Sequence, residues 1–295
     1  MAAPAWRHWV EAARPKTLPA AVIPVLVGTA LAAAHRSADI GKAAVCLLFA
    51  LLVQVGTNFA NDYFDFVKGA DTPGRVGPRR AVAAGLIAPP TMLAATGLVL
   101  SAAFLVGLLL VREGGWGLLL IGVVSIVCAL AYTGGPFPLG YNGLGDVFVF
   151  VFFGLVAVDA TFYVQAGGLA PDATSCAVAI GLLAANILVA NNYRDAETDA
   201  RAGKKTLVVR FGRKFAVRQY ALSHAVALLC PAALLIYGYK WPVLLPVLLA
   251  PWALRLARRL ALSREPAEQI KLLGATAAYL AAFGGLLSTG LVLGR

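Results

Sequence analysis

Apolar residues along this chain come in long runs that short polar segments separate. Each run holds about 20 residues, the length that an α-helix needs to cross the hydrocarbon core of a bilayer. Nine runs can be marked, at residues 18–34, 43–64, 89–111, 116–132, 144–165, 173–193, 216–238, 241–259 and 270–293. The pattern predicts an all-α, multi-pass membrane protein with about nine transmembrane helices, forming a single domain over residues 1–295.

Composition agrees with this prediction. Hydrophobic residues make up 60% of the chain, and charged residues only 13%, about half the usual share in soluble domains. Residues 1–16 hold Trp6, Trp9 and three basic residues, a composition typical of an interfacial helix. A basic start, an apolar run and Ala32-Ala33-Ala34 also fit a signal peptide, but similar runs follow, so the first run is more simply the first span.

The basic residues predict the orientation in the membrane. When the N-terminus and every second loop are assigned to one side, that side holds 20 of the 25 Lys and Arg residues. Positive charge favours the cytoplasmic face, so the N-terminus is expected inside and the C-terminus outside. The net charge of +11 lies in loops between spans. It therefore indicates topology and lipid contact, and no nucleic-acid partner is expected.

Cysteine and histidine offer no site of their own. The four cysteines lie in apolar runs and no Cys-x-x-Cys spacing occurs, so we interpret them as packing residues without a disulfide or zinc site. The three histidines are scattered at His8, His35 and His224. A histidine metal site and a Ser-His-Asp triad are both disfavoured.

The acids are concentrated at two places. Six of the 14 acidic residues lie in or just after two clusters, each at the end of an apolar run. They are Asp62, Asp65, Asp71, Asp195, Glu197 and Asp199. A shift of 130 residues places Asn61, Tyr63 and Asp65 on Asn191, Tyr193 and Asp195, and Asp62 on Asn192. This correspondence predicts an internal repeat with two matching clusters on the cytoplasmic face.

Neighbouring carboxylates repel one another and stay ionised readily when a cation lies between them. Mg²⁺ uses one or two carboxylates and leaves other positions to water and phosphate. We therefore predict Mg²⁺ as the cofactor. The expected metal ligands are Asn61, Asp62, Asp65, Asp195 and Asp199, with Asn192 as a helper.

Basic residues follow directly behind both clusters. A metal ion together with Lys and Arg is a common way to hold a diphosphate and stabilise its departure. The expected diphosphate contacts are Lys68, Arg75, Arg79, Lys204 and Arg210. The alternative is that the acids are solvated helix ends and the cations are only topology signals, which we accept for Arg255, Arg258, Arg259 and Arg264. For Asp159, inside a run, an interfacial or hydrogen-bonded role is favoured.

Five motifs in this order resemble the intramembrane aromatic prenyltransferase (UbiA) superfamily, and most closely its 1,4-dihydroxy-2-naphthoate polyprenyltransferases of menaquinone synthesis. The similarity covers about residues 14–215 and continues more weakly beyond. The motifs are Arg14-Pro-Lys16-Thr17, Asn61-Asp62-Tyr63-Phe64-Asp65, Arg75-Val76-Gly77-Pro78-Arg79, Tyr132-Thr133-Gly134-Gly135-Pro136 with Leu144-Gly145-Asp146, and Asn192 to Leu207 around Asp195, Asp199 and Lys204.

This resemblance implies nine helices around a central cavity. It also implies Mg²⁺ that bridges the two Asp clusters to a polyprenyl diphosphate, whose tail lies in a tunnel open to the lipid bilayer. Asp65, Asp195, Asp199 and Lys204 would be catalytic. The superfamily often has a further Asp in the first motif, at the position of Gly69 here, and Asp71 follows two residues later.

The expected reaction is prenyl transfer to 1,4-dihydroxy-2-naphthoate with loss of CO₂ and diphosphate, in the plasma membrane of a bacterium and facing the cytoplasm. Arg14 or Lys16 could meet the acceptor carboxylate, and Tyr132 offers an aromatic face beside Gly134 and Gly135. Alternatives are another acceptor such as 4-hydroxybenzoate, or a repeat-built transporter. A CDP-alcohol phosphotransferase is disfavoured because its Asp-Gly-x-x-Ala-Arg signature is absent.

The orientation can be tested with single cysteines at Ser37 and Thr72, labelled in intact cells by a reagent that does not cross membranes. We expect labelling at residue 37 alone, because the basic loops stay inside. Equal access to both positions would contradict the predicted topology.

Overall fold

The computed structural model describes residues 5–71, 77 and 79–295, and within these the regular structure is helical. Predictions for Thr72 and Arg75 concern residues outside that part. The elements are α1 (Ala5–Ala13), η1 (Pro15–Thr17), α2 (Pro19–Ala34), α3 (Ile40–Val67), α4 (Pro89–Ala131), α5 (Gly145–Val149), η2 (Phe150–Val156), α6 (Ala157–Ala166), α7 (Pro171–Arg201), α8 (Leu207–Ile236), η3 (Trp241–Leu249), α9 (Ala250–Leu262) and α10 (Pro266–Leu293).

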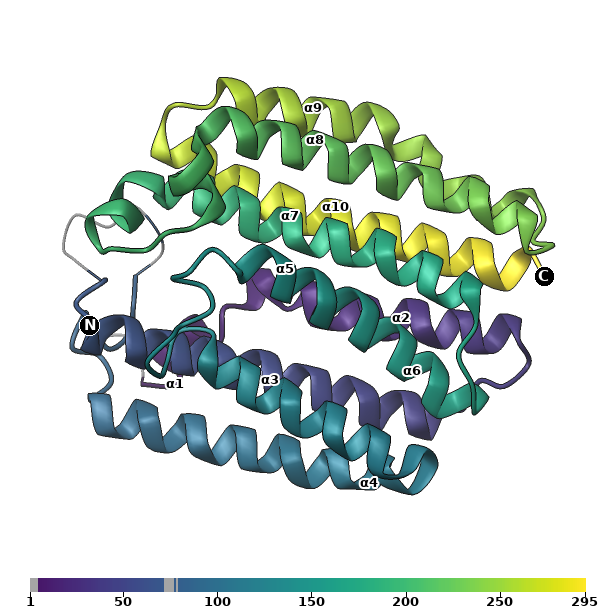
Figure 1. Ribbon diagram of the computed structural model, residues 1–295, viewed down its shortest axis with the longest axis horizontal. Helices are drawn as coiled ribbons and strands as arrows, with labels where there is room; N and C mark the ends of the chain where they lie inside the picture. Colours follow the sequence, from purple (N-terminus) through teal and green to yellow (C-terminus); the bar gives the residue numbers. More distant parts are fainter. Residues whose placement is uncertain (1–4, 72–76, 78) are drawn as a thin grey trace.

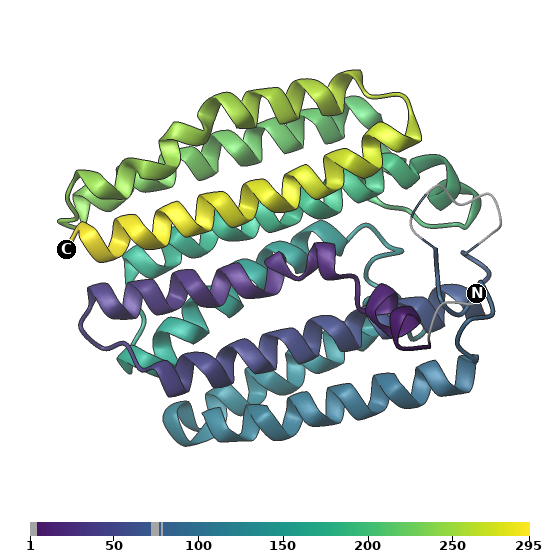
Figure 2. The same cartoon turned by 180° about the vertical axis from the view of Figure 1, so that it is seen from behind.

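The long helices run side by side, so their connections gather at two ends of the bundle (Figure 1). One end holds α1, the α4–α5 connection and the α7–α8 connection, and the C-terminus lies at the other end. From behind, α2 runs between α10 and α3 (Figure 2). Helices from the beginning, middle and end of the chain therefore surround a shared interior.

Within the described residues, six helices are long and apolar enough to cross a membrane, or seven if the α1–η1 segment and α2, which are bent by 52°, form one broken span. The runs predicted at 89–111 and 116–132 both lie in α4. Gly115 interrupts this helix with φ 61° and ψ −153°, and the chain reverses there (Figure 1). The run at 241–259 begins as η3, whose Pro242 and Pro246 disfavour a regular α-helix. The total of nine spans stays a prediction.

The second acid cluster lies on a helix. The predicted span ends near residue 193, with a loop to follow, but α7 continues to Arg201, because Arg, Ala and Glu are strong helix formers. Gly203 then stops it with φ 74°, and the Lys204 amide donates to the Asp199 carbonyl oxygen at 2.9 Å. Asp195 and Asp199 are therefore one turn apart on a single face.

α7 is the central element of the helical core, and a close glycine contact joins it to η2. A Cβ added at Gly181 would lie 2.7 Å from the Phe150 carbonyl oxygen and 2.9 Å from the Gly154 Cα. Small residues permit such close backbone approach between membrane helices. The contact holds η2, a π-helical segment that lines the interior, against α7.

This contact predicts that Gly181→Val destabilises the protein by roughly 1–3 kcal/mol, because the added methyl groups force η2 away from α7. Gly97→Val in α4 is the matched control, since nothing lies within 4 Å of a Cβ placed there. Thermal unfolding in detergent should give a lower Tm for Gly181→Val and a nearly unchanged Tm for Gly97→Val. Equal Tm values for the two variants would show that the contact is not needed.

Candidate active site

A cavity of about 350 Å³ lies within the bundle, and side chains of both acid clusters line it. This volume lies in the range of small-molecule sites. Its polar end is lined by side chains from both clusters, Asn61, Asp65, Asn192, Asp195 and Asp199 among them. Its remaining wall is apolar and partly aromatic, with Phe49, Phe104, Phe148 and Phe152. A charged group and a long hydrocarbon tail could therefore share this one space.

Asp65, near the end of α3, is a buried carboxylate with partners from three other segments of the chain. It is only 2% exposed. Its Oδ1 accepts a hydrogen bond from the Tyr141 hydroxyl at 2.7 Å and lies 3.2 Å from the Lys204 Nζ. Its Oδ2 lies 3.3 Å from Nη2 of Arg80. A buried charge needs such partners, because each one offsets part of the lost hydration.

Lys204 brings the two acid clusters together. Its ammonium lies 3.2 Å from Asp65 Oδ1 and 3.8 Å from Asp199 Oδ1. These carboxylates belong to α3 and α7, and Lys204 directly follows the glycine that ends α7. The carboxylates of the repeated motifs therefore face one another across a single positive charge.

Asp195 is held by the residue before it. Arg194 donates to Oδ1 of Asp195 from Nε at 2.7 Å and to Oδ2 from Nη2 at 2.6 Å. The same Nη2 donates to Asn191 Oδ1 at 2.8 Å. Arg194 is buried but does not line the cavity, whereas Asp195 does. The bidentate pair fixes the direction in which the Asp195 carboxylate points.

Two predicted ligands of the first cluster have different surroundings. Asn61 lines the cavity and accepts a hydrogen bond from the Thr133 hydroxyl at 2.8 Å. Asp62 does not line it, and its two oxygens accept from the backbone amides of Ala81 and Val82, each at 3.1 Å. In this structure Asp62 ties the segment before α4 to α3.

The cations that were predicted to bind phosphate have different surroundings. Lys204 lines the cavity, and Lys68 lies beside it, donating to the carbonyl oxygens of Thr133 at 2.6 Å and Gly135 at 3.4 Å. Arg210 is exposed and donates hydrogen bonds to the backbone carbonyl oxygens of Lys205 and Asn142. Arg79 is exposed as well and does not line the cavity. Arg75 lies outside the described residues.

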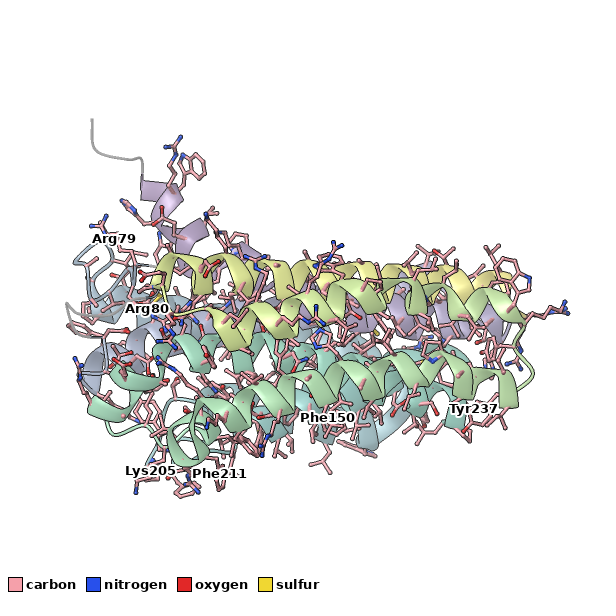
Figure 3. The ribbon with its side chains drawn as sticks, turned by 90° about the horizontal axis from the view of Figure 1, so that it is seen from above. Arg79, Arg80, Phe150, Lys205, Phe211 and Tyr237 are labelled. Atoms are coloured by element: carbon pink, nitrogen blue, oxygen red, sulfur yellow. The ribbon has the colours of Figure 1, made fainter. Side chains whose placement is uncertain are left out.

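Arg80 occupies the place that the sequence suggested for Arg79. Figure 3 shows Arg80 nearer the bundle, with Arg79 further out. Arg80 lines the cavity, and besides Asp65 it lies 3.4 Å from Asp71 Oδ1 through Nε. Asp71 therefore belongs to the same charged cluster. The sequence alone did not separate these adjacent arginines, because the turn that orients them depends on Asp62 and its backbone contacts.

Of the residues predicted to contact the acceptor, only some line the cavity. Arg14 and Tyr132 line the cavity, whereas Lys16 is exposed and does not. Arg14 has a left-handed backbone with φ 53°, a conformation that is costly for a residue other than glycine. Asn58 holds this turn by donating from Nδ2 to the Ala13 carbonyl oxygen at 2.9 Å.

Burial shifts the pKa of two side chains at the site. Loss of hydration raises the pKa of Tyr141, and the neighbouring Asp65 carboxylate raises it further, so this residue stays a phenol that can donate. Loss of hydration lowers the pKa of Lys68, and the Lys204 charge lowers it further against the opposing effect of Asp65.

Asp159 stands apart from this cluster. Thr174 donates toward both of its oxygens at 3.3 Å, and Asp159 does not line the cavity. The prediction of a hydrogen-bonded acid is confirmed. Tyr141, Arg80 and Arg194 were not singled out from the sequence. For Tyr141 a signal was available in the sequence. It is an aromatic residue in the Gly/Pro-rich connector of residues 132–146, which was expected at the same membrane face as both acid clusters.

Comparison with known proteins agrees with this geometry. The UbiA prenyltransferase family matches residues 21–290. The chain belongs to this family. It is 37% identical to a 1,4-dihydroxy-2-naphthoate octaprenyltransferase of Haemophilus influenzae, over 98% of this chain and 96% of that protein. It is 40% identical to the Escherichia coli protein of the same name, over 88% of this chain and 86% of that one.

A solved UbiA homologue of Archaeoglobus fulgidus, bound to DMAPP and Mg²⁺, shares the fold with a TM-score of 0.70. The alignment covers 95% of this chain and 99% of that one at 17% sequence identity. The predicted family and the all-helical multi-pass membrane architecture are confirmed.

Lys204 provides a direct test of this site. Charge-assisted contacts to phosphate contribute roughly 1.5–3 kcal/mol each, so Lys204→Ala should lower kcat/KM for a prenyl diphosphate by about ten- to a hundred-fold. Lys205→Ala is the matched control, because the neighbouring side chain is exposed and lies at the outside of the bundle (Figure 3). An effect of Lys204→Ala on the aromatic substrate alone would contradict the assignment.

Proposed function

We propose that this protein transfers a polyprenyl group from polyprenyl diphosphate to 1,4-dihydroxy-2-naphthoate, giving a demethylmenaquinol (the reduced form of demethylmenaquinone), CO₂ and diphosphate. One observation carries the proposal. Carboxylates from two repeated motifs face one another across Lys204 at the polar end of a largely apolar cavity. The names of the H. influenzae and E. coli relatives support the choice of acceptor.

The donor set suits Mg²⁺. Among the described residues no group of three or more His, Cys, Asp or Glu side chains is close enough to hold a metal by itself. Mg²⁺ does not need such a group, because it commonly takes one or two carboxylates and completes its shell with water and phosphate. Asp65 and Asp199 already face a common cation, the Lys204 ammonium.

Asp65, Asp195 and Asp199 would therefore hold Mg²⁺, with Asn61 and Asn192 beside them. The ion would neutralise charge on the departing diphosphate. Asp62 would act by positioning, through its backbone contacts. Lys204, Lys68 and Arg80 would contact the diphosphate oxygens as it leaves.

The cavity wall then controls the reactive intermediate. As the bond between the prenyl C1 and the diphosphate oxygen breaks, an allylic cation is left in an apolar chamber that excludes water. The ring carbon that carries the carboxylate donates the electron pair for the new bond to C1. The acceptor carboxylate leaves as CO₂, and its bonding electrons restore the aromatic ring. No covalent enzyme intermediate is needed.

Arg14 is the cation that we assign to the acceptor carboxylate. It lines the cavity, as Tyr132 does, whereas Lys16 does not. The left-handed backbone at Arg14 is held by contacts from α3, as expected where geometry serves a site.

This assignment predicts that Arg14→Gln raises the KM for the naphthoate by about tenfold or more, because a charge-assisted contact is lost. The KM for the prenyl diphosphate should change little. Lys16→Gln is the matched control, and steady-state kinetics with each substrate varied in turn measures both variants. A larger effect of Lys16→Gln than of Arg14→Gln would reverse the assignment.

The relatives named above come from bacteria, so we place the protein in a plasma membrane, with its active site facing the cytoplasm. The basic asymmetry of the chain supports this orientation. A transporter is the candidate from another class, but the acid clusters lie in the last turns of α3 and α7, away from the middle of these helices.

Mass spectrometry of the product tests the proposal. Purified protein receives Mg²⁺, a polyprenyl diphosphate and equal amounts of 1,4-dihydroxy-2-naphthoate and 4-hydroxybenzoate. We expect the decarboxylated prenyl naphthalene product to dominate. Equal prenylation of both acids would refute the acceptor, and solute flux without any prenyl product would refute the enzyme class.

A further inference from the structure

We infer that Tyr141 is a positioning residue for the prenyl donor, holding Lys68 and Lys204 where a diphosphate would bridge their ammonium groups. The inference rests on the proposed function and assigns a role to a side chain outside the acid motifs. Tyr141 lies in the connector between α4 and α5. It is half-buried and lines the cavity.

Both lysines contact the ring of Tyr141. The Lys68 Nζ lies 5.0 Å from the ring centroid, and the Lys204 Nζ lies 4.7 Å from it. Each distance is within the range of a favourable cation–π contact. One aromatic ring therefore attracts two ammonium groups that repel each other, and these groups come from α3 and from the α7–α8 connection.

The hydroxyl group of Tyr141 adds a third contact. It donates to Asp65 Oδ1 at 2.7 Å, and Lys204 lies 3.2 Å from the same oxygen. Ring and hydroxyl group together link the first acid cluster, its following lysine and the lysine behind the second cluster.

The backbone of the connector is tied to the same region. The Lys205 amide donates to the Tyr141 carbonyl oxygen at 2.7 Å, and Arg210 Nη2 donates to the Asn142 carbonyl oxygen at 2.9 Å. Gly143, with φ 81°, lets the chain pass close to the Lys205 carbonyl oxygen, where a Cβ would lie 2.8 Å away. Arg210 thus supports the donor site through the connector and not through phosphate contact.

The geometry suits a diphosphate of a prenyl donor. Two ammonium groups near one ring are held together at a cost, because like charges repel. A diphosphate placed between them would remove that repulsion and accept hydrogen bonds from both. Tyr141 itself would then be free to donate to Asp65 or to a phosphate oxygen.

Two substitutions separate the ring from the hydroxyl group. Tyr141→Phe keeps the ring and should raise the donor KM by only about two- to five-fold, through the lost hydrogen bond to Asp65. Tyr141→Leu also removes the cation–π contacts and should raise it by about ten- to a hundred-fold. The KM for the naphthoate should stay within about twofold in both variants. Tyr237→Leu, an exposed tyrosine at the opposite end (Figure 3), is the control.

The closing experiment measures the affinity of each protein for a prenyl thiodiphosphate that binds with Mg²⁺ but reacts slowly, alongside turnover. We expect weaker binding in the order wild type, Tyr141→Phe, Tyr141→Leu, with wild-type affinity in Tyr237→Leu. Unchanged donor affinity in Tyr141→Leu overturns the inference, and so does an equal rise in the KM of both substrates, which indicates a general structural role. Wild-type protein that binds the analogue but prenylates no aromatic acid overturns the proposed function and leaves the role of Tyr141 in donor binding intact.

Discussion

The contact on which the site depends is that of the Lys204 ammonium with Asp65 and Asp199. Two buried carboxylates that face one another repel, and a cation between them offsets part of the hydration that both have lost. The contact also joins segments more than 130 residues apart in the chain, since Asp65 ends α3 and Asp199 lies near the end of α7. In the proposed reaction Mg²⁺ and diphosphate would take over this neutralisation, and Lys204 would turn to the phosphate oxygens.

The arrangement of the helices brings Asp65, Asp199 and Lys204 together. α3 and α7 each carry an acid cluster in their final turns, and the close contact of Gly154 with Gly181 holds η2 beside α7. The apolar cavity then extends from the charged end along the helices. The charged side chains that line the cavity thus gather at one end of it, while the rest of its wall stays suited to a hydrocarbon chain.

The sequence predicted the long elements well, because hydrophobic runs of membrane length and repeated acid motifs are local patterns. The sequence also indicated that Asp65, Asp195, Asp199 and Lys204 share one site, and all four line the same cavity in the structure. The choice of Arg80 over Arg79, and of Arg14 over Lys16, depends on turns fixed by distant partners such as Asp62 with Ala81 and Asn58 with Ala13. The positioning role of Tyr141 depends on three segments of the chain that come together only in the folded protein. No single stretch of sequence holds that information.

The most direct test of the central claim is the Mg²⁺-dependent rate of prenyl transfer in Asp195→Asn compared with Asp159→Asn. Asp195 lines the cavity, whereas Asp159 is half-buried and lies outside it. The account predicts that Asp195→Asn loses most of its turnover while remaining folded, that Asp159→Asn stays active, and that excess EDTA abolishes the activity of the wild type. Full activity in Asp195→Asn, or in wild-type protein with excess EDTA, would contradict it.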